Sequence, residues 1–265
     1  MTCSIGILPR LEADRELSEI WAARLDLPLL EAGEPTSVKD PTIVVQVSGG
    51  EASLCLTGPG APGPLAVDFT SAKLFRRVRQ GLSQSLARAC GLRAGRRPSI
   101  LDATAGLGRD AYVLAALGSE VTMVERDPVL HLLLELALQR LSGCSSEAQR
   151  GDLRLELHLD EGRRFMLAED FLVPDVIYLD PMFPPRRKSA RVKKEMQLLH
   201  AMLGDPPTGD AESLLQEALR KARQRVVVKR PRISPPLGGK KPHQSFVGRS
   251  HRYDLYLVPT VGSRD

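Results

Sequence analysis

From Ser99 onward, short apolar runs alternate with helical patterns, and this alternation limits the possible folds more than any other feature. The runs typical of buried strands are 99–101, 121–124, 153–159, 176–179 and 225–229. Helical patterns cover 109–117, 192–203 and 211–223, the last with Asp210 as N-cap, and Asp127-Pro128 opens a further helix. Segments 246–247 and 253–258 are expected to close the sheet as an antiparallel pair. The pattern predicts an α/β domain on a mostly parallel, doubly wound sheet with right-handed crossovers.

The first 65 residues have a different pattern, that of a small α/β subdomain. We expect a strand at 4–8, a helix at 11–25, and a hairpin of 43–47 with 52–56. The Gly- and Pro-rich run 58–64 follows and is the best boundary in the chain. A basic helix over 71–89 is then expected to lead into the second part. The predicted domains are therefore a subdomain at 1–65 and a main domain at 66–265.

Composition and residue spacing exclude several classes of protein. Of 265 residues, 42% are hydrophobic and 26% are charged, as in ordinary globular proteins. No apolar run is long enough to span a bilayer, and no secretory signal is recognisable. Cysteines and histidines lack the spacing of metal ligands. We therefore expect a cytoplasmic protein without a membrane segment or a metal, and the net charge of +5 is compatible with a polyanionic partner.

A glycine turn lies between the first strand and the first helix of the alternating part. Gly106 and Gly108 let the backbone approach a ligand closely, and the helix start adds free N–H groups. With Ala111 and Glu125, the turn also fits the fingerprint of a dinucleotide site, so NAD stays a formal alternative. However, Asp102 would oppose a pyrophosphate. Its charge suits a ligand that carries an amino group and a sulfonium.

Acidic residues follow four successive strands. They are Asp102, Glu125, Asp160 with Glu161 beside it, and Asp180. Acids at such turns often cap helices, which is the structural alternative. The carboxyl ends of parallel strands, however, lie at one edge of the sheet, where ligands bind. Four acids in these places therefore favour a ligand site.

The tetrad Asp180-Pro181-Met182-Phe183 follows the strand at 176–179. Its carboxylate and carbonyl groups can accept hydrogen bonds from an amine, and its aromatic ring can stack on a base. It resembles the Asn/Asp-Pro-Pro-Tyr/Phe motif of amino-group methyltransferases, with Met182 in place of the second proline. Asp-Pro after a strand is also an ordinary turn. If the tetrad is catalytic, Asp180 and the Pro181 carbonyl would hold the amine while Phe183 stacks on the base.

Basic residues are concentrated after the tetrad and after the fifth strand. The first cluster is Arg186, Arg187, Lys188, Arg191, Lys193 and Lys194. The second comprises Lys229, Arg230, Arg232, Lys240, Lys241, Arg249 and Arg252. Such runs are often only solvated surface. Because both clusters should flank the ligand edge of the sheet, we expect them to bind phosphates of a nucleic acid.

Longer segments resemble one family, the ribosomal RNA small subunit methyltransferase J family. The matching segments are 67–69, 101–111, 124–126, 178–184, 188–190, 192–196 and 226–231. The resemblance runs from about residue 67 to Tyr256, and the first 60 residues match only in general character. It implies a Rossmann-like class I methyltransferase sheet and the cofactor S-adenosyl-L-methionine. It also implies methyl transfer to the N2 amine of a guanosine in bacterial small-subunit (16S) ribosomal RNA, as naked RNA or as the 30S particle.

The resemblance carries site residues onto this chain. The implied catalytic residues are Asp180, Pro181 and Phe183. The implied cofactor-binding residues are Asp102, Gly106, Gly108, Arg109, Asp110, Glu125, Arg126, Asp160, Glu161 and Asp180. The expected RNA-binding residues are Arg186, Arg187, Lys188, Arg191, Lys193, Lys194, Lys229 and Arg230. No metal and no stable protein partner are expected.

Other functions stay open at this point. The same tetrad could serve methylation of adenine in DNA or of a protein glutamine. A non-catalytic RNA-binding protein with a vestigial cofactor fold is a third possibility, although the intact set of strand-end acids opposes it. An NAD enzyme is the weakest alternative because no hydride-transfer site is recognisable.

Overall fold

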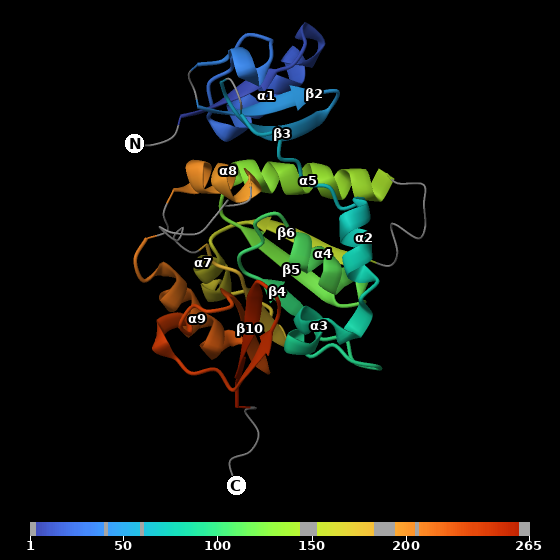
Figure 1. Ribbon diagram of the computed structural model, residues 1–265, viewed down its shortest axis with the longest axis vertical. Helices are drawn as coiled ribbons and strands as arrows, with labels where there is room; N and C mark the ends of the chain where they lie inside the picture. The colour runs from blue at the N-terminus through green and yellow to red at the C-terminus, as the bar shows by residue number, and fades with distance from the viewer. Residues whose placement is uncertain are drawn as a thin grey trace. The chain divides into compact units, whose positions relative to one another are not determined.

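The computed structural model of the chain describes residues 4–39, 42–58, 61–143, 153–182, 194–204 and 207–259 (Figure 1). The chain forms two compact units. The first comprises Met1–Asp68, Glu135–Ala137 and Met182–Pro206. The second comprises Phe69–Leu134, Leu138–Pro181 and Pro207–Asp265. The domain division after residue 65 stays a prediction.

The N-terminal part of the first unit is a three-stranded sheet, drawn in blue in Figure 1. Its strands are β1 (Ile5–Pro9), β2 (Ile43–Ser48) and β3 (Glu51–Leu56), in that order. β2 and β3 form the expected hairpin, and Gly49 and Gly50 turn it with positive φ angles of 57° and 81°. Leu8, Val44 and Cys55 form a small core on this sheet. Helices α1 (Arg15–Leu25) and α8 (Lys194–Leu203) belong to the same unit.

The second unit contains a seven-stranded sheet in the order β6-β5-β4-β7-β8-β10-β9. The strands are β4 (Ile100–Asp102), β5 (Glu120–Glu125), β6 (Arg154–Leu159), β7 (Val176–Leu179), β8 (Arg225–Pro231), β9 (Gln244–Val247) and β10 (His251–Leu257). β4 to β8 are parallel, whereas β10 runs antiparallel to β8 and β9. The predicted mostly parallel sheet with an antiparallel end is therefore confirmed.

The chain reverses direction across this sheet between β4 and β7. It runs outward from β4 through β5 to β6, then returns to β7 on the other side of β4. In open α/β sheets, ligands bind outside the carboxyl ends of the strands at such a switch point. Asp102 ends β4 and Asp180 follows β7, so these two acids flank the switch point.

Among the described residues, five α-helices lie wholly in the second unit, and α5 (Pro128–Gly143) lies in it except for Glu135–Ala137. The five are α2 (Ala72–Val78), α3 (Ser85–Cys90), α4 (Arg109–Ala116), α7 (Gly162–Leu167) and α9 (Asp210–Lys221). Asp127 caps α5 as expected, because its Oδ1 accepts hydrogen bonds from the N–H groups of Val129 (3.0 Å) and Leu130 (2.9 Å). No helix in the described part of the chain is long and apolar enough to cross a membrane.

Two expectations about helices were wrong. The single helix over 71–89 is instead split into α2 and α3 by a 3-10 turn at Gly81–Ser83, where Gly81 has a φ of +60°. Asp210 does not cap α9 but is its first residue. Gly209 holds the N-cap position with a φ of 84°, and the Asp210 carboxylate pairs with Arg126 instead.

The two faces of the large sheet differ in their residues, because one packs on an apolar core and the other includes polar side chains. Alternate residues such as Ile177, Leu179, Val226 and Val228 join an apolar core that includes side chains from α7 and α9. Because successive strand residues point to opposite faces, the intervening residues lie on the other face. That face contains Tyr178 and the polar groups described below.

Candidate active site

The loop after β4 is tied to the loop after β7. Asp102 is buried, and its Oδ1 accepts a hydrogen bond from the Thr104 N–H at 3.2 Å. The Thr104 hydroxyl in turn accepts a hydrogen bond from the Asp180 N–H at 2.6 Å. Burial raises the pKa of Asp102 well above its ordinary value. The two acids that flank the switch point are thus fixed through one threonine.

The two glycines of the turn have different roles. Both have positive φ angles, 55° for Gly106 and 65° for Gly108. A Cβ at Gly106 would meet only the Thr104 carbonyl oxygen, at 3.9 Å, so the backbone there faces open space. A Cβ at Gly108 would lie 2.7 Å from Leu134 and 2.9 Å from Phe69. Gly106 therefore leaves room for a ligand against the backbone, whereas Gly108 is required by packing.

Glu125, at the end of β5, supports the glycine turn. Its Oε2 accepts a hydrogen bond from the Gly106 N–H at 2.7 Å, and its Oε1 accepts one from the Asp127 N–H at 2.9 Å. Burial raises the pKa of Glu125 to about 7, although both hydrogen bonds act in the opposite direction. Each carboxylate oxygen has a second lone pair, which can accept a hydrogen bond from a ligand hydroxyl.

The acids after β6 have partners within the protein. Glu161 caps α7, because its carboxylate oxygens accept hydrogen bonds from the N–H groups of Arg163 and Arg164, each at 2.9 Å. Asp160 pairs with the Arg164 side chain and accepts a hydrogen bond from the Glu161 N–H. These contacts give Glu161 a structural role. Cofactor contacts of Asp160 and Glu161 stay predictions.

A buried cluster of charges lies beside Asp180. Lys229 Nζ donates hydrogen bonds to Asp180 Oδ2 at 2.6 Å and to Asp110 Oδ2 at 3.0 Å. Asp110 also pairs with Arg77 and accepts a hydrogen bond from the Tyr178 hydroxyl. Two acids are therefore matched by two cations. Cofactor contacts of Asp110 stay a prediction, since the structure places its carboxylate in this cluster.

The cluster shifts the pKa of each of its members. Burial raises the pKa of Asp180, and Lys229 only partly offsets this. Burial also acts to raise the pKa of Asp110, but Lys229 and Arg77 hold that pKa well below its usual range. Burial acts to lower the pKa of Lys229, yet the charges of Asp180 and Asp110 raise it above its ordinary value. The Asp180 side chain keeps 36% of its surface exposed, so it remains accessible to a substrate.

Lys229 and Arg230 have partners within the protein, so their contacts with RNA phosphates stay a prediction. Lys229 is held by two acids, and Arg230 is only 7% exposed. The Arg230 guanidinium donates hydrogen bonds to the Pro235 carbonyl oxygen at 3.2 and 2.7 Å, and burial lowers its pKa. Sequence alternation offered a signal for this. Residues 229 and 230 are neighbours on a strand, so their side chains must point to opposite faces.

The loop after β8 is held by a second buried arginine. Arg252 pairs with the fully buried Asp254 at 2.8 Å. Its NH1 group also donates to the carbonyl oxygens of Arg232 (2.8 Å) and Ser234 (2.7 Å). These contacts oppose the expectation that Arg252 binds phosphates. Its side chain instead fixes the course of a loop that begins at the ligand edge of the sheet.

The remaining predicted site residues are placed in part. Arg109 is half-buried in the first turn of α4, and Pro181 is buried directly after Asp180. Arg126 pairs with Asp210 at 3.0 Å, so its cofactor contact stays a prediction. Six predicted site residues lie outside the described part of the chain, namely Phe183, Arg186, Arg187, Lys188, Arg191 and Lys193. The side chain of Lys194 also lies outside it.

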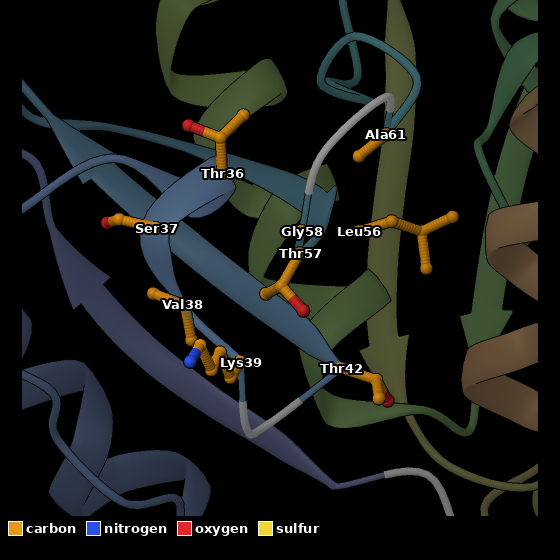
Figure 2. A pocket seen from close by; sticks show the side chains of 9 residues that line it. All are labelled: Thr36, Ser37, Val38, Lys39, Thr42, Leu56, Thr57, Gly58 and Ala61. Carbon is orange, nitrogen blue, oxygen red and sulfur yellow. The ribbon is translucent and has the colours of Figure 1, made fainter.

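A hollow of about 740 Å³ lies in the N-terminal part of the first unit (Figure 2). It is lined by Thr36, Ser37, Val38, Lys39, Thr42, Leu56, Thr57, Gly58 and Ala61. None of the residues predicted to bind cofactor or RNA lines it. Among the described residues, no group of three or more acids, histidines or cysteines is arranged to hold a metal ion.

Comparison with known proteins identifies the family. The family model described as "Putative SAM-dependent methyltransferase" matches residues 8–258. A protein of Thioalkalivibrio sulfidiphilus named ribosomal RNA small subunit methyltransferase J is 47% identical over 247 residues, which cover 92% of this chain and 94% of the relative. A Pseudomonas aeruginosa protein of the same name is 45% identical, covering 95% and 94%. The chain belongs to the ribosomal RNA small subunit methyltransferase J family.

A solved structure agrees with membership of the methyltransferase J family. The crystal structure of a SAM-dependent methyltransferase from Neisseria gonorrhoeae is 31% identical to this chain, with a TM-score of 0.68. The match covers 97% of both chains. The predicted class I methyltransferase fold is thereby confirmed, and this methyltransferase J family member is an enzyme that uses S-adenosylmethionine.

The residues at the switch point fit that cofactor. The backbone at Gly106 has open space beside it, and Glu125 offers acceptors for hydroxyl groups such as those of a ribose. Asp102 and Asp180 place carboxyl groups at the carboxyl ends of β4 and β7, the edge where ligands bind in open α/β sheets, and in their charged form they would attract a cationic amino group or sulfonium. This donor and acceptor set suits S-adenosylmethionine better than a pyrophosphate ligand.

Proposed function

We propose that this enzyme transfers a methyl group to the exocyclic N2 amine of a guanosine in small-subunit ribosomal RNA. The observation that carries the proposal is the Asp180 carboxylate. It lies at the switch point, is partly exposed, and is held through one oxygen by Lys229. The names of the relatives support ribosomal RNA as the substrate. The residue types of the tetrad support an amine as the acceptor.

S-adenosylmethionine supplies a methyl group on a sulfonium, already activated for in-line displacement. The task of the protein is therefore to bind and orient. Gly106 would let the cofactor lie against the backbone, and Glu125 would accept hydrogen bonds from its ribose hydroxyls. Asp102 would favour the cationic part of the cofactor. Asp102 and Glu125 end two neighbouring strands, and Glu125 holds the Gly106 backbone, so the sheet fixes the positions of all three residues.

Asp180 would hold the amine of the substrate. Its Oδ2 is engaged by Lys229, while its Oδ1 accepts no hydrogen bond from the residues that the structure describes. The lone pair of the guanine amine is delocalised into the ring, which makes it a poor nucleophile. A hydrogen bond donated by an amine N–H to Asp180 Oδ1 would help to localise that lone pair and aim it at the methyl group. Formation of the N–CH3 bond would break the S–CH3 bond and release neutral S-adenosylhomocysteine, and the positively charged nitrogen would then lose one proton to water.

Two further residues of the tetrad would complete the amine site. The Pro181 carbonyl oxygen would accept a hydrogen bond from the second N–H of the amine, and Phe183 would stack on the base. Exposing a guanine from RNA structure costs a few kcal/mol. Stacking on an aromatic ring returns about 1–3 kcal/mol of that cost. The stacking role of Phe183 and the phosphate role of the cluster 186–194 are parts of this proposal.

Described cations at the same edge of the sheet suit a polyanionic substrate. Arg232, Lys240 and Lys241 are exposed in the loop that follows β8. β8 is parallel to β7 and adjacent to it, so this loop starts at the edge where Asp180 lies. The Arg230 and Arg252 side chains fix the loop by donating hydrogen bonds to its carbonyl oxygens. Phosphate contacts by the exposed cations would make RNA binding weaken steeply with salt.

Labelled methyl transfer tests the proposal. The enzyme is incubated with labelled S-adenosylmethionine and, separately, with small-subunit RNA lacking the modification, duplex DNA, and protein extract. Label in RNA alone is the expected result. Label in DNA adenine or in protein glutamine would overturn RNA as the substrate, while the role of the tetrad in holding an amino group would stand. Absence of label from all three acceptors would contradict the proposed acceptor.

A further inference from the structure

We infer that Lys229 is a positioning residue that keeps Asp180 charged and aims its free carboxylate oxygen at the substrate amine. This inference rests on the proposed function of Asp180. It concerns a residue whose basic neighbours in the sequence had indicated a phosphate contact. Lys229 itself would touch neither the cofactor nor the base.

The geometry places Lys229 between two acids and behind the reacting edge. Its ammonium group lies 2.6 Å from Asp180 Oδ2 and 3.0 Å from Asp110 Oδ2. An ammonium group has three donors, so these two contacts fix its position. In the sheet, Leu179 pairs with Val228, which brings the residues that follow them, Asp180 and Lys229, side by side. The contact is therefore built into the register of β7 and β8.

Charged and titratable groups from every surrounding element bear on the pair. Arg77 comes from α2, Asp110 from α4, Asp102 from the end of β4, Tyr178 from β7 and Tyr253 from β10. Arg77 pairs with Asp110 and so supports the side of the cluster away from Asp180. Asp110 and Asp102 disfavour a charge on Asp180, because like charges repel. Among the residues that the structure describes, Lys229 is the nearest cation to Asp180 and contributes the largest favourable charge.

Burial of these charged groups costs free energy of folding. An arrangement that is kept at this cost indicates a role other than stability. Only 25% of the Lys229 side chain is exposed, and desolvation opposes the charge on both partners. Buried ion pairs often contribute no net stability relative to apolar residues of similar volume. A neutral Asp180 would be a weaker acceptor for an amine N–H than a carboxylate is. Lys229 therefore matters chiefly for the charge state and direction of Asp180.

The test compares the rate of methyl transfer at saturating S-adenosylmethionine from pH 5.5 to 9.5 in four proteins. They are the wild type, Lys229→Met, Lys229→Arg and the matched control Lys73→Met, which alters an exposed lysine on α2. Loss of an adjacent cation raises the pKa of a carboxyl by about 1–3 units. The acidic limb of the Lys229→Met profile should therefore move to higher pH by about 1–3 units, and activity should recover in base. Lys229→Arg and Lys73→Met should keep the wild-type limb.

A limb that stays in its wild-type position in Lys229→Met overturns the inference, whatever the size of the rate loss. Such a uniform loss would mean that Lys229 only supports the fold. If Lys229→Met fails to fold, the charge-balanced variant Lys229→Met/Asp110→Asn takes its place. It removes one acid together with the cation, which leaves Arg77 to balance Asp180. Its limb should still move to higher pH, because Lys229 lowers the pKa of Asp180 more than Asp110 raises it, and Arg77 acts more weakly than either.

A measurement without catalysis separates this inference from the proposed function. Urea unfolding is followed from pH 5 to 9 for Lys229→Met with and without Asp180→Asn. A carboxyl with a raised folded-state pKa binds protons in the folded protein, so its stabilising contribution is lost as pH rises. The free energy of unfolding of Lys229→Met should fall with rising pH relative to that of Lys229→Met/Asp180→Asn. The wild type should show a smaller fall relative to Asp180→Asn. Equal differences would overturn the inference even if the RNA substrate is correct. A missing RNA product with unequal differences would overturn only the proposed function.

Discussion

The backbone N–H of Gly106 donates a hydrogen bond to Glu125 Oε2 at 2.7 Å, which ties the turn after β4 to the end of β5. The same carboxylate accepts the Asp127 N–H at 2.9 Å. Two loops of the cofactor edge are thereby fixed by one side chain. The acid that would bind the cofactor also shapes the turn against which the cofactor would lie.

Glu125→Gln should weaken the binding of S-adenosylmethionine. Glutamine keeps one acceptor oxygen but presents an amide NH2 group to one of the two backbone N–H donors. The amide also replaces the charged acceptor for a ribose hydroxyl, and loss of one hydrogen bond to a charged group costs about 1.5–3 kcal/mol, or about 10- to 150-fold in affinity. Isothermal titration calorimetry measures the change. Wild-type affinity in this variant would remove Glu125 from the cofactor site.

Cofactor affinity should depend on pH near neutrality. Burial raises the pKa of Glu125 to about 7, and its carboxylate form is the one that suits ribose hydroxyls and a cationic cofactor. Affinity should therefore be full above pH 7 and fall as the pH drops below it, by up to about tenfold per unit. Calorimetry between pH 6 and 8.5 checks this. Glu125→Gln is the control and should lose this dependence.

The two glycines of the turn should respond differently to alanine. Gly108→Ala adds a Cβ against Leu134 and Phe69 at a positive φ, so it should lower the free energy of unfolding by about 2–4 kcal/mol. Gly106→Ala meets open space and should cost only about 1–2 kcal/mol of backbone strain. Its methyl group would instead occupy cofactor space and lower affinity for S-adenosylmethionine. Urea unfolding and calorimetry on both variants compare the two effects. The reverse order of stabilities would contradict the assigned roles.

Arg252 should be essential for stability. Arg252→Met leaves Asp254 buried without its ion-pair partner and releases the carbonyls of Arg232 and Ser234, which should cost about 3–5 kcal/mol. Arg252→Met/Asp254→Leu removes both charges and should recover part of the loss. Urea unfolding measures both variants, and hydrogen exchange in the loop should quicken in the single variant. No recovery in the double variant would mean that the carbonyl contacts, rather than the ion pair, dominate.

Asp180→Asn should lower the rate of methyl transfer by about 10²–10³-fold at saturating cofactor, the range seen when one preorganised hydrogen-bonding group is lost. Asparagine keeps the shape of the side chain and still offers Lys229 an acceptor oxygen. Circular dichroism should therefore report an intact fold. A rate within about threefold of the wild type, less than 0.7 kcal/mol, would remove Asp180 from catalysis.

The sequence predicted the sheet and the strand-end acids because both depend on local periodicity. Parallel strands place their carboxyl ends at one edge of the sheet, so the sequence alone predicts that Asp102, Glu125 and Asp180 lie at a common edge. The partners of these acids depend on register and on distant elements. Arg77 reaches Asp110 from a helix that precedes the whole sheet, and no local pattern indicates that contact.

Some missed features did have signals in the sequence. Lys229 and Arg230 read as one basic run, but the two-residue period of a strand separates them onto opposite faces. Glu161 stands directly before a helix, where an acid caps the N–H groups as readily as it binds a ligand. Gly81 inside the predicted helix 71–89 marked the break between α2 and α3. In each case tertiary or capping contacts decided between two local interpretations.

The most direct test of the central claim is to locate the transferred methyl group. Small-subunit RNA that lacks the modification is incubated with the enzyme and labelled S-adenosylmethionine, then digested and examined by mass spectrometry. We predict N2-methylguanosine at a single position with the wild type and a strongly reduced yield with Asp180→Asn. Label on another base or atom, or equal yields from both proteins, would contradict the amine site proposed at Asp180.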